Sequence, residues 1–115
     1  MLPRIRPRLY LSPGLPIGPG KVDLLRHVRE QASISAAARA MGMSYRRAWQ
    51  LIDELNRGLG QPVVRTATGG KGGGGACLTA AGETLVDRYA ALEQQLNEVA
   101  TPHLEAIAGL VVRQP

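Results

Sequence analysis

Residues 33–59 read SISAAARAMGMSYRRAWQLIDELNRGL, and this segment predicts two helices joined by a tight turn. The first helix is short and Ala-rich, covering 36–41, with Ser33 and Ser35 as candidate N-caps. Gly42 is expected to end it, because glycine readily adopts the left-handed conformation that closes a helix. Small side chains let the second helix cross closely, so the pair predicts a helix-turn-helix.

The second helix of the pair is expected to begin after Ser44, a favourable N-cap, and to extend to about Leu59. Its inward stripe recurs at spacings of four, three and four residues and consists of Ala48, Ile52, Leu55 and Leu59. Trp49 lies beside this stripe and is interpreted as a core residue rather than a base-stacking one. The N-terminus of the helix is then free to enter a DNA major groove.

Upstream of this pair, the sequence predicts an extended arm and one more helix. Residues 1–20 are rich in Pro and Gly, with a β-like patch at 8–11. A helix is expected from about Lys21 to Gln31, because Gly and Pro precede it and apolar residues then recur at helical spacing. The inward residues are Val22, Leu25 and Val28, with Leu24 flanking them.

Downstream of the pair, the sequence predicts a glycine-rich β-hairpin. Residues 62–65 are rich in Val and are predicted to form a strand, with 76–78 as its antiparallel partner. The loop between them is glycine-rich with one lysine, which predicts a long wing tip. Cys77, the single cysteine, is interpreted as a small core residue of the second strand. The fold class expected is therefore mainly α with a small hairpin, a winged helix-turn-helix.

A long helix capped by Thr79 is expected to follow the hairpin, with Glu83 and Asp87 near its positive end. Pro102 is expected to break this helix, leaving a short turn or tail over 103–110. Its apolar positions alternate at spacings of four and three, which is typical of a coiled-coil contact; they are Leu85, Tyr89, Leu92, Leu96 and Val99. This seam predicts a homodimer, and the alternative is that it packs back on its own domain.

The composition favours a polyanion as partner and gives no support to membrane or secretory classes. Residues 1–75 carry a net charge of +8 and residues 76–115 a net charge of −3, within a chain of 115 residues and net charge +5. No apolar run approaches the roughly 20 residues that span a bilayer. Prolines interrupt the basic N-terminus, so no secretory signal is expected, and a cytoplasmic location is predicted.

An enzyme is the class that the residues fit least. His27 and His103 have no ligand-spaced partners and are interpreted as ordinary helix residues, and no nucleophile has a neighbouring base. Lys71 is followed by Gly72, so the hydroxyl that a phosphate-binding P-loop requires is missing. No catalytic residue, metal site or cofactor is therefore predicted.

Three stretches together are similar to the N-terminal domain of the ModE family of molybdate-responsive transcription regulators, which have a winged helix of the LysR type. The stretches are SISAAA at 33–38, MSYRRAW at 43–49 and ATGGKGGGGA at 67–76, the last followed by Leu78 and Thr79. The wing is the most specific of them, and the resemblance covers roughly residues 20–100.

One departure from the ModE pattern limits what the resemblance implies. ModE proteins that sense molybdate carry additional C-terminal oxyanion-binding domains, and no positions in residues 1–115 correspond to them. The expectation is therefore a DNA-binding half on its own, controlling molybdate transport or molybdenum-enzyme genes. Sensing would then belong to a separate protein or be absent.

The residues expected to contact double-stranded DNA lie in the helix-turn-helix and the wing. Arginines in the first turn of the recognition helix can each donate two hydrogen bonds to guanine, and Gln50 can read adenine. Helix-capping serines and a flexible wing suit the phosphate backbone or the minor groove. The predicted set is Ser35, Ser44, Tyr45, Arg46, Arg47, Gln50, Arg65, Thr68 and Lys71.

This interpretation divides the chain into an arm (1–20), a DNA-binding domain (21–79), a dimerisation helix (80–101) and a short helix or tail (102–115). A two-fold dimer implies a palindromic operator. Two rival functions stay open at this point. One is an architectural protein that binds DNA without reading its sequence, and the other is a partner of a full-length ModE-like regulator.

Overall fold

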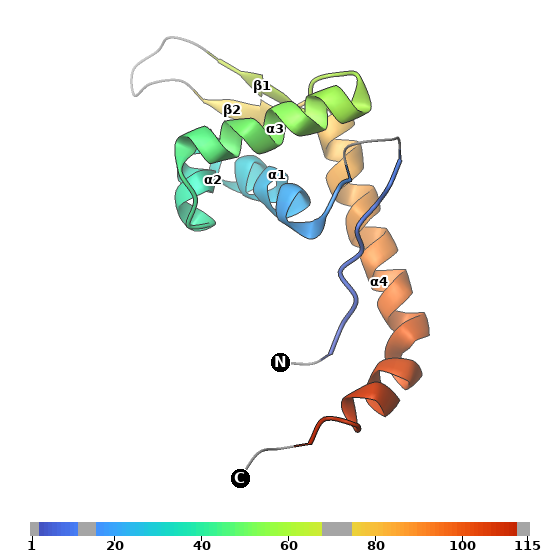
Figure 1. The fold of residues 1–115 in the computed structure, drawn as a ribbon. Coiled ribbons are helices and arrows are strands. Elements are labelled where there is room, and N and C mark those ends of the chain that lie inside the picture. The colour runs from blue at the N-terminus through green and yellow to red at the C-terminus, as the bar shows by residue number, and fades with distance from the viewer. Residues whose placement is uncertain (1–2, 12–15, 68–74, 113–115) are drawn as a thin grey trace.

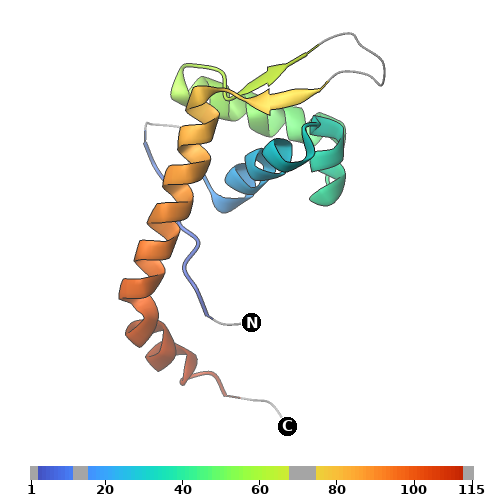
Figure 2. The same ribbon diagram turned by 180° about the vertical axis from the view of Figure 1, so that it is seen from behind.

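A computed structural model describes residues 3–11, 16–67 and 75–112. Three helices and a two-stranded hairpin form a body from which one long helix projects, with the N-terminal segment lying alongside that helix (Figures 1 and 2). The elements are α1 (Pro19–Gln31), α2 (Ile34–Ala40), α3 (Tyr45–Leu59), β1 (Val64–Thr66), β2 (Ala76–Leu78) and α4 (Ala80–Ala108). The predicted winged helix-turn-helix is confirmed.

The ends of α2 and α3 follow local signals, with one correction. The Ser44 hydroxyl accepts a hydrogen bond from the Arg47 N–H at 3.0 Å, so Ser44 caps α3 as predicted. At α2 the cap is Ser33, whose hydroxyl accepts from the Ala36 N–H at 3.1 Å. The prediction that Ser35 caps α2 is wrong, because the helix begins at Ile34 and Ser35 lies inside its first turn. Gly42 ends α2 with a positive φ of 67°.

An aliphatic core joins the three short helices to the hairpin and to α4. Every inward residue predicted for α1 is buried, as are Ala48, Ile52 and Leu55 of α3. Leu59 is half-buried against this core, and Trp49 packs against it in the same way, as predicted. The hairpin and α4 add mainly Val63, Ala76, Leu78, Val86 and Tyr89. The core therefore fixes α3 and the hairpin in one rigid body.

The hairpin is antiparallel, and its register pairs Val64 with Leu78 and Arg65 with Cys77. Cys77 is exposed, so its interpretation as a core residue is wrong. Side chains alternate between the two faces of a strand, and Ala76 and Leu78 occupy the inward face of β2. Cys77 and Arg65 consequently share the outward face. The predicted wing tip falls largely on residues 68–74, which lie outside the described residues.

Helix α4 starts as predicted, but it continues past Pro102. The Thr79 hydroxyl accepts from the Gly82 N–H at 3.2 Å, and the helix then runs for 29 residues to Ala108. The predicted break at Pro102 is wrong. Proline has a helix-compatible φ and removes one hydrogen bond, so a helix can bend there instead of ending. Figure 1 shows such a bend near the C-terminal end of α4.

The predicted seam of α4 is divided between the core and the surface. Tyr89 is only 1% exposed, and Leu85 is half-buried against the same core. The expectation that Tyr89 forms a dimer contact is therefore wrong, because its own domain covers it. Leu92 and Val99 are exposed and Leu96 is half-buried. No helix in the described part of the chain is long and apolar enough to cross a membrane.

Gly82 packs tightly against Val63, the residue before β1, and Gly82→Ala is expected to lower the free energy of unfolding by about 1–3 kcal/mol. The added Cβ would collide with the carbonyl oxygen of Val63. That oxygen cannot move freely, since it accepts a hydrogen bond from the Thr79 N–H at 3.0 Å. Urea unfolding followed by circular dichroism measures the loss.

The matched control for this change is Gly20→Ala in α1, where an added Cβ meets nothing within 4 Å. It should be neutral or stabilise by up to about 1 kcal/mol, because alanine favours a helix over glycine. Equal stability of the two variants would contradict the packing described at Gly82.

Candidate nucleic-acid interface

The N-terminal turn of α3 is a surface of polar and basic side chains. Ser44, Tyr45, Arg46 and Arg47 are all exposed there, and Gln50 is exposed one turn further on. The helix dipole places partial positive charge at this same end. The turn therefore presents hydrogen-bond donors, positive charge and an amide to solvent in one place.

Side-chain contacts along α3 preorder part of this surface. The Arg47 Nη1 donates to the Gln50 Oε1 at 3.4 Å, which holds the two side chains together. The rings of Tyr45 and Trp49 meet edge to face, with centroids 6.3 Å apart and planes at 89°. Because Trp49 packs against the core, this contact anchors the exposed tyrosine at the start of the helix.

The hairpin adds a second exposed surface on the same side of the body. Figures 1 and 2 both place the open end of the hairpin and the start of α3 on one side, away from the far end of α4. Arg65 is exposed on the outward face of β1. The predicted contacts Thr68 and Lys71 lie outside the described residues, and Ser35 is exposed on α2.

The arginines of this surface form no ion pairs within the described part of the protein, a property that they share with Arg4, Arg8 and Arg88. Among the residues that the structure describes, Arg46, Arg47 and Arg65 have no carboxylate within 4.0 Å. The basic residues with acidic partners are Arg6, Lys21, Arg26, Arg29 and Arg57. Positive charge on the α3 and hairpin surface is thus left for an external anion.

One further arginine belongs with this group and was not predicted from the sequence. Arg39 lies exposed in the last turn of α2 and, among the described residues, has no acidic partner within 4.0 Å. An arginine within the otherwise small and apolar ISAAARA helix was the available signal. A charged residue in such a helix is placed at the surface, next to the turn that leads into α3.

A helix-turn-helix followed by a hairpin, with exposed arginines at the start of the second helix, defines a winged-helix DNA-binding domain. The crystal structure titled "CbnR_DBD-DNA complex" has this fold, with a TM-score of 0.60 and 20% identity, over 77% of this chain and 95% of that one. The family model described as bacterial regulatory helix-turn-helix protein, lysR family, matches residues 20–83, and the chain belongs to that family.

Two curated relatives show which members of this family the chain is similar to. It is 49% identical over 80 residues to the molybdenum-pterin-binding protein MopB of Rhodobacter capsulatus, which is 70% of this chain and 30% of that protein. It is 43% identical over 86 residues to the transcriptional dual regulator ModE of Escherichia coli, which is 75% of this chain and 33% of that protein. The predicted resemblance to the ModE family is confirmed. The chain spans about a third of the length of these relatives.

Proposed function

We propose that the chain binds a palindromic operator in double-stranded DNA as a homodimer and so regulates genes of molybdate transport or molybdenum enzymes. The observation that carries this proposal is the pair of exposed arginines at the N-terminus of α3, which have no carboxylate partner among the described residues and lie in the recognition position of a LysR-type fold. The named ModE and MopB relatives support the link to molybdenum.

In this proposal α3 enters the major groove with its N-terminal turn first. Arg46 and Arg47 donate paired hydrogen bonds to guanine, and Gln50 pairs with adenine. Tyr45 and Ser44 contact the backbone at the rim of the groove, where the exposed N–H groups of the helix end favour a phosphate. Arg65, with Thr68 and Lys71 of the wing, contacts the adjoining backbone or minor groove.

The homodimer proposal uses the exposed part of α4. Leu92, Leu96 and Val99 form an apolar stripe beyond the body of the domain. An apolar groove adjoins this stripe and is lined by residues that include Leu11, Leu59, Leu85 and Leu92. Apolar surface of this kind favours a second copy, and a two-fold dimer places its recognition helices about 34–36 Å apart on one face of the DNA.

The proposal is tested by selecting a duplex from a random-sequence library and titrating it, beside a scrambled duplex, at several salt concentrations. A specificity ratio of roughly 10³ or more is expected for the selected palindrome. Equal, steeply salt-dependent binding to both duplexes would instead indicate an architectural protein. An absence of binding at low salt would overturn the proposal in favour of a protein-interaction role.

The mode of reading is tested with Arg46→Lys combined with Arg47→Lys, which keeps both charges. Lysine cannot reproduce the planar two-donor geometry of arginine, so binding to the palindrome should fall by about tenfold or more while binding to the scrambled duplex changes little. Fluorescence anisotropy measures both affinities. An unchanged specificity ratio would contradict direct reading of guanine by these residues.

A further inference from the structure

Helix α4 is attached to the rest of the protein in two different ways along its length. Its first three turns pack on the body, where Val86 and Tyr89 are buried. The Arg29 Nη1 of α1 also pairs with Glu83 at 3.0 Å and with Asp87 at 2.8 Å. In the described part of the chain, the polar contacts that α4 makes beyond Asp87 to other segments all go to residues 5–7.

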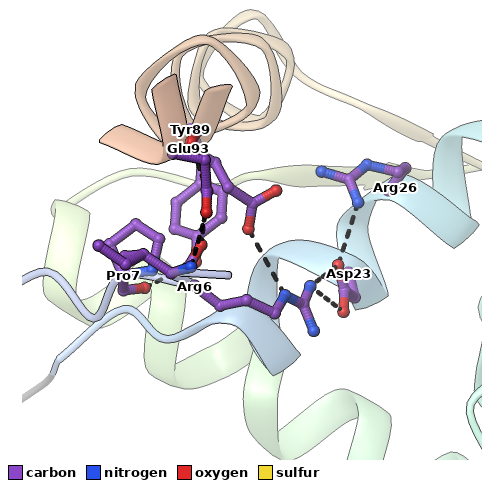
Figure 3. A network of polar contacts seen from close by, with 8 residues as sticks. Arg6, Pro7, Asp23, Arg26, Tyr89 and Glu93 are labelled. Carbon is purple, nitrogen blue, oxygen red and sulfur yellow. Dashed lines mark hydrogen bonds and ion pairs between the residues drawn. The ribbon is translucent and has the colours of Figure 1, made fainter. Parts of the chain in front are cut away.

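One face of α4 receives the N-terminal segment at successive turns. The Tyr89 hydroxyl donates to the Pro7 carbonyl at 2.6 Å, and the Arg6 Nε lies 3.5 Å from the Glu93 Oε2 (Figure 3). The Asn97 side chain clamps Ile5, because its Oδ1 accepts from the Ile5 N–H at 2.7 Å while its Nδ2 donates to the Ile5 carbonyl at 2.8 Å. Tyr89, Glu93 and Asn97 are spaced by four residues, which places them on the same face.

Arg6 connects this face of α4 to α1. Its Nη2 donates to both carboxylate oxygens of Asp23, at 2.8 and 2.7 Å, and Asp23 also pairs with Arg26 at 3.1 Å (Figure 3). The hydrogen bond to Asp23 raises the pKa of Arg6 above its usual value, so the guanidinium stays charged. Two arginines and two carboxylates thus form a balanced, half-buried network between α1, the segment and α4.

The other end of the segment is tied to the body. Leu9 and Ile17 exchange two backbone hydrogen bonds of 2.8 Å, and Leu9 packs against the core. Residues 5–9 are therefore fixed to α4 at one end and to the base of α1 at the other.

We infer that residues 3–9 are a splint that sets the direction of α4 relative to α3, with Arg6 as its positioning residue. Counted at 3.6 residues per turn, the apolar stripe of Leu92, Leu96 and Val99 lies about 90° around α4 from the face that the splint covers. The splint therefore leaves the proposed dimer face uncovered. It fixes the angle between α4 and the body of the domain. The effect of the splint on DNA binding rests on the proposed function.

The angle between α4 and the body matters because α4 is long, so a small tilt displaces its far end by a large distance. At 1.5 Å per residue its 29 residues extend for about 43 Å. A tilt of about 10° over an arm of about 20 Å displaces its end by roughly 3.5 Å, close to one base-pair step along the DNA. A dimer formed through α4 can hold one half-site spacing only if that tilt is fixed.

The test compares palindromes whose half-site spacing is changed by one, two or three base pairs, together with a single half-site. Wild-type protein should prefer one spacing by tenfold or more, and Arg6→Ala should reduce that preference to about twofold. Half-site affinity and the sedimentation of the dimer should not change. Arg6→Lys should restore part of the preference, and Asn97→Ala, which removes the clamp without a change of charge, should weaken it as well.

Arg4→Ala is the matched control, because Arg4 is exposed in the same segment and, among the described residues, has no carboxylate partner within 4.0 Å. It should keep the wild-type spacing preference. If Arg6→Ala keeps that preference too, the splint is refuted. It is also refuted if Arg6→Ala lowers affinity for the single half-site and for every palindrome by the same factor.

A measurement without DNA separates this inference from the proposed function. Spin labels on Arg39→Cys and Gln95→Cys, in a Cys77→Ser background and diluted with unlabelled protein, report the distance between α2 and α4. A single narrow distribution is expected with Arg6 present and a clearly broader one with Arg6→Ala. Equal widths would refute the splint even if DNA binds as proposed, and broadening would support it even if no operator is found.

Discussion

Replacing Arg46 and Arg47 with alanine is expected to lower affinity for the operator by at least about 30-fold. Each arginine that pairs with guanine through two hydrogen bonds contributes about 1–3 kcal/mol of discrimination, and every 1.4 kcal/mol is tenfold in affinity. Both side chains are exposed, and neither has a carboxylate partner among the described residues. Their removal should therefore change the free energy of unfolding by no more than about 0.5 kcal/mol.

The control for this prediction is Arg57→Ala on the same helix. It removes one positive charge, against two in the double variant, and Arg57 is paired with Asp53 and lies 11 residues beyond Arg46, about 16 Å along the axis. Anisotropy titrations at fixed salt should show an effect of less than about tenfold for Arg57→Ala. If both changes weaken binding equally, the arginines of α3 act only through charge, and the assignment of its N-terminal turn to the bases is wrong.

The short elements of this fold follow from signals within a few residues of each other. Ser44 caps α3, Gly42 turns the chain with a positive φ, and alternation in the hairpin puts Val64 and Leu78 on its inward face. Each of these features depends on local backbone chemistry that the sequence displays directly. The α3 residues of the candidate site could be predicted for the same reason. Once the inward stripe of α3 is known, the residues on the opposite face of the helix must be exposed.

The features that could not be predicted depend on contacts between distant residues or on small differences in free energy between alternative backbone conformations. By spacing alone, Tyr89 fits a coiled-coil seam. Its hydroxyl instead donates to the carbonyl of Pro7, which lies 82 residues upstream and which no local pattern connects to it. The burial of Tyr89 also raises its pKa. Pro102 carries a strong helix-breaking signal, yet a bend in an exposed helix accommodates it.

Cys77 shows the limit of composition as a guide to burial. Cysteine is among the residues most often buried, but in a three-residue strand the register decides which side chain faces inward. The register is fixed here by Val64 and Leu78, so the cysteine opposite Arg65 faces solvent. The network around Arg6 was missed in the same way, because no local pattern links position 6 to positions 23 and 93.

Replacing Leu92 and Leu96 with aspartate is expected to convert the dimer into monomers and to weaken operator binding by about 10²–10⁴-fold, which is the gain that joining two binding sites provides. The two leucines lie on the apolar stripe of α4, where Leu92 is exposed and Leu96 is half-buried, and neither belongs to the buried core of the domain. Two carboxylates from each chain would repel across a two-fold contact and could not be desolvated there. Sedimentation velocity measures the assembly, and titration with a palindrome and with a single half-site measures binding.

Affinity for the single half-site separates loss of the dimer from damage to the domain. It should be unchanged in the aspartate variant, because Ser44 to Gln50 and the core that positions them are not altered. Ala91→Asp combined with Gln94→Asp is the control: it adds the same charge to the same turns of α4, on exposed positions about 100° or more from Leu92 and Leu96. That variant should remain a dimer. A dimer that survives Leu92→Asp and Leu96→Asp would exclude the stripe as the contact.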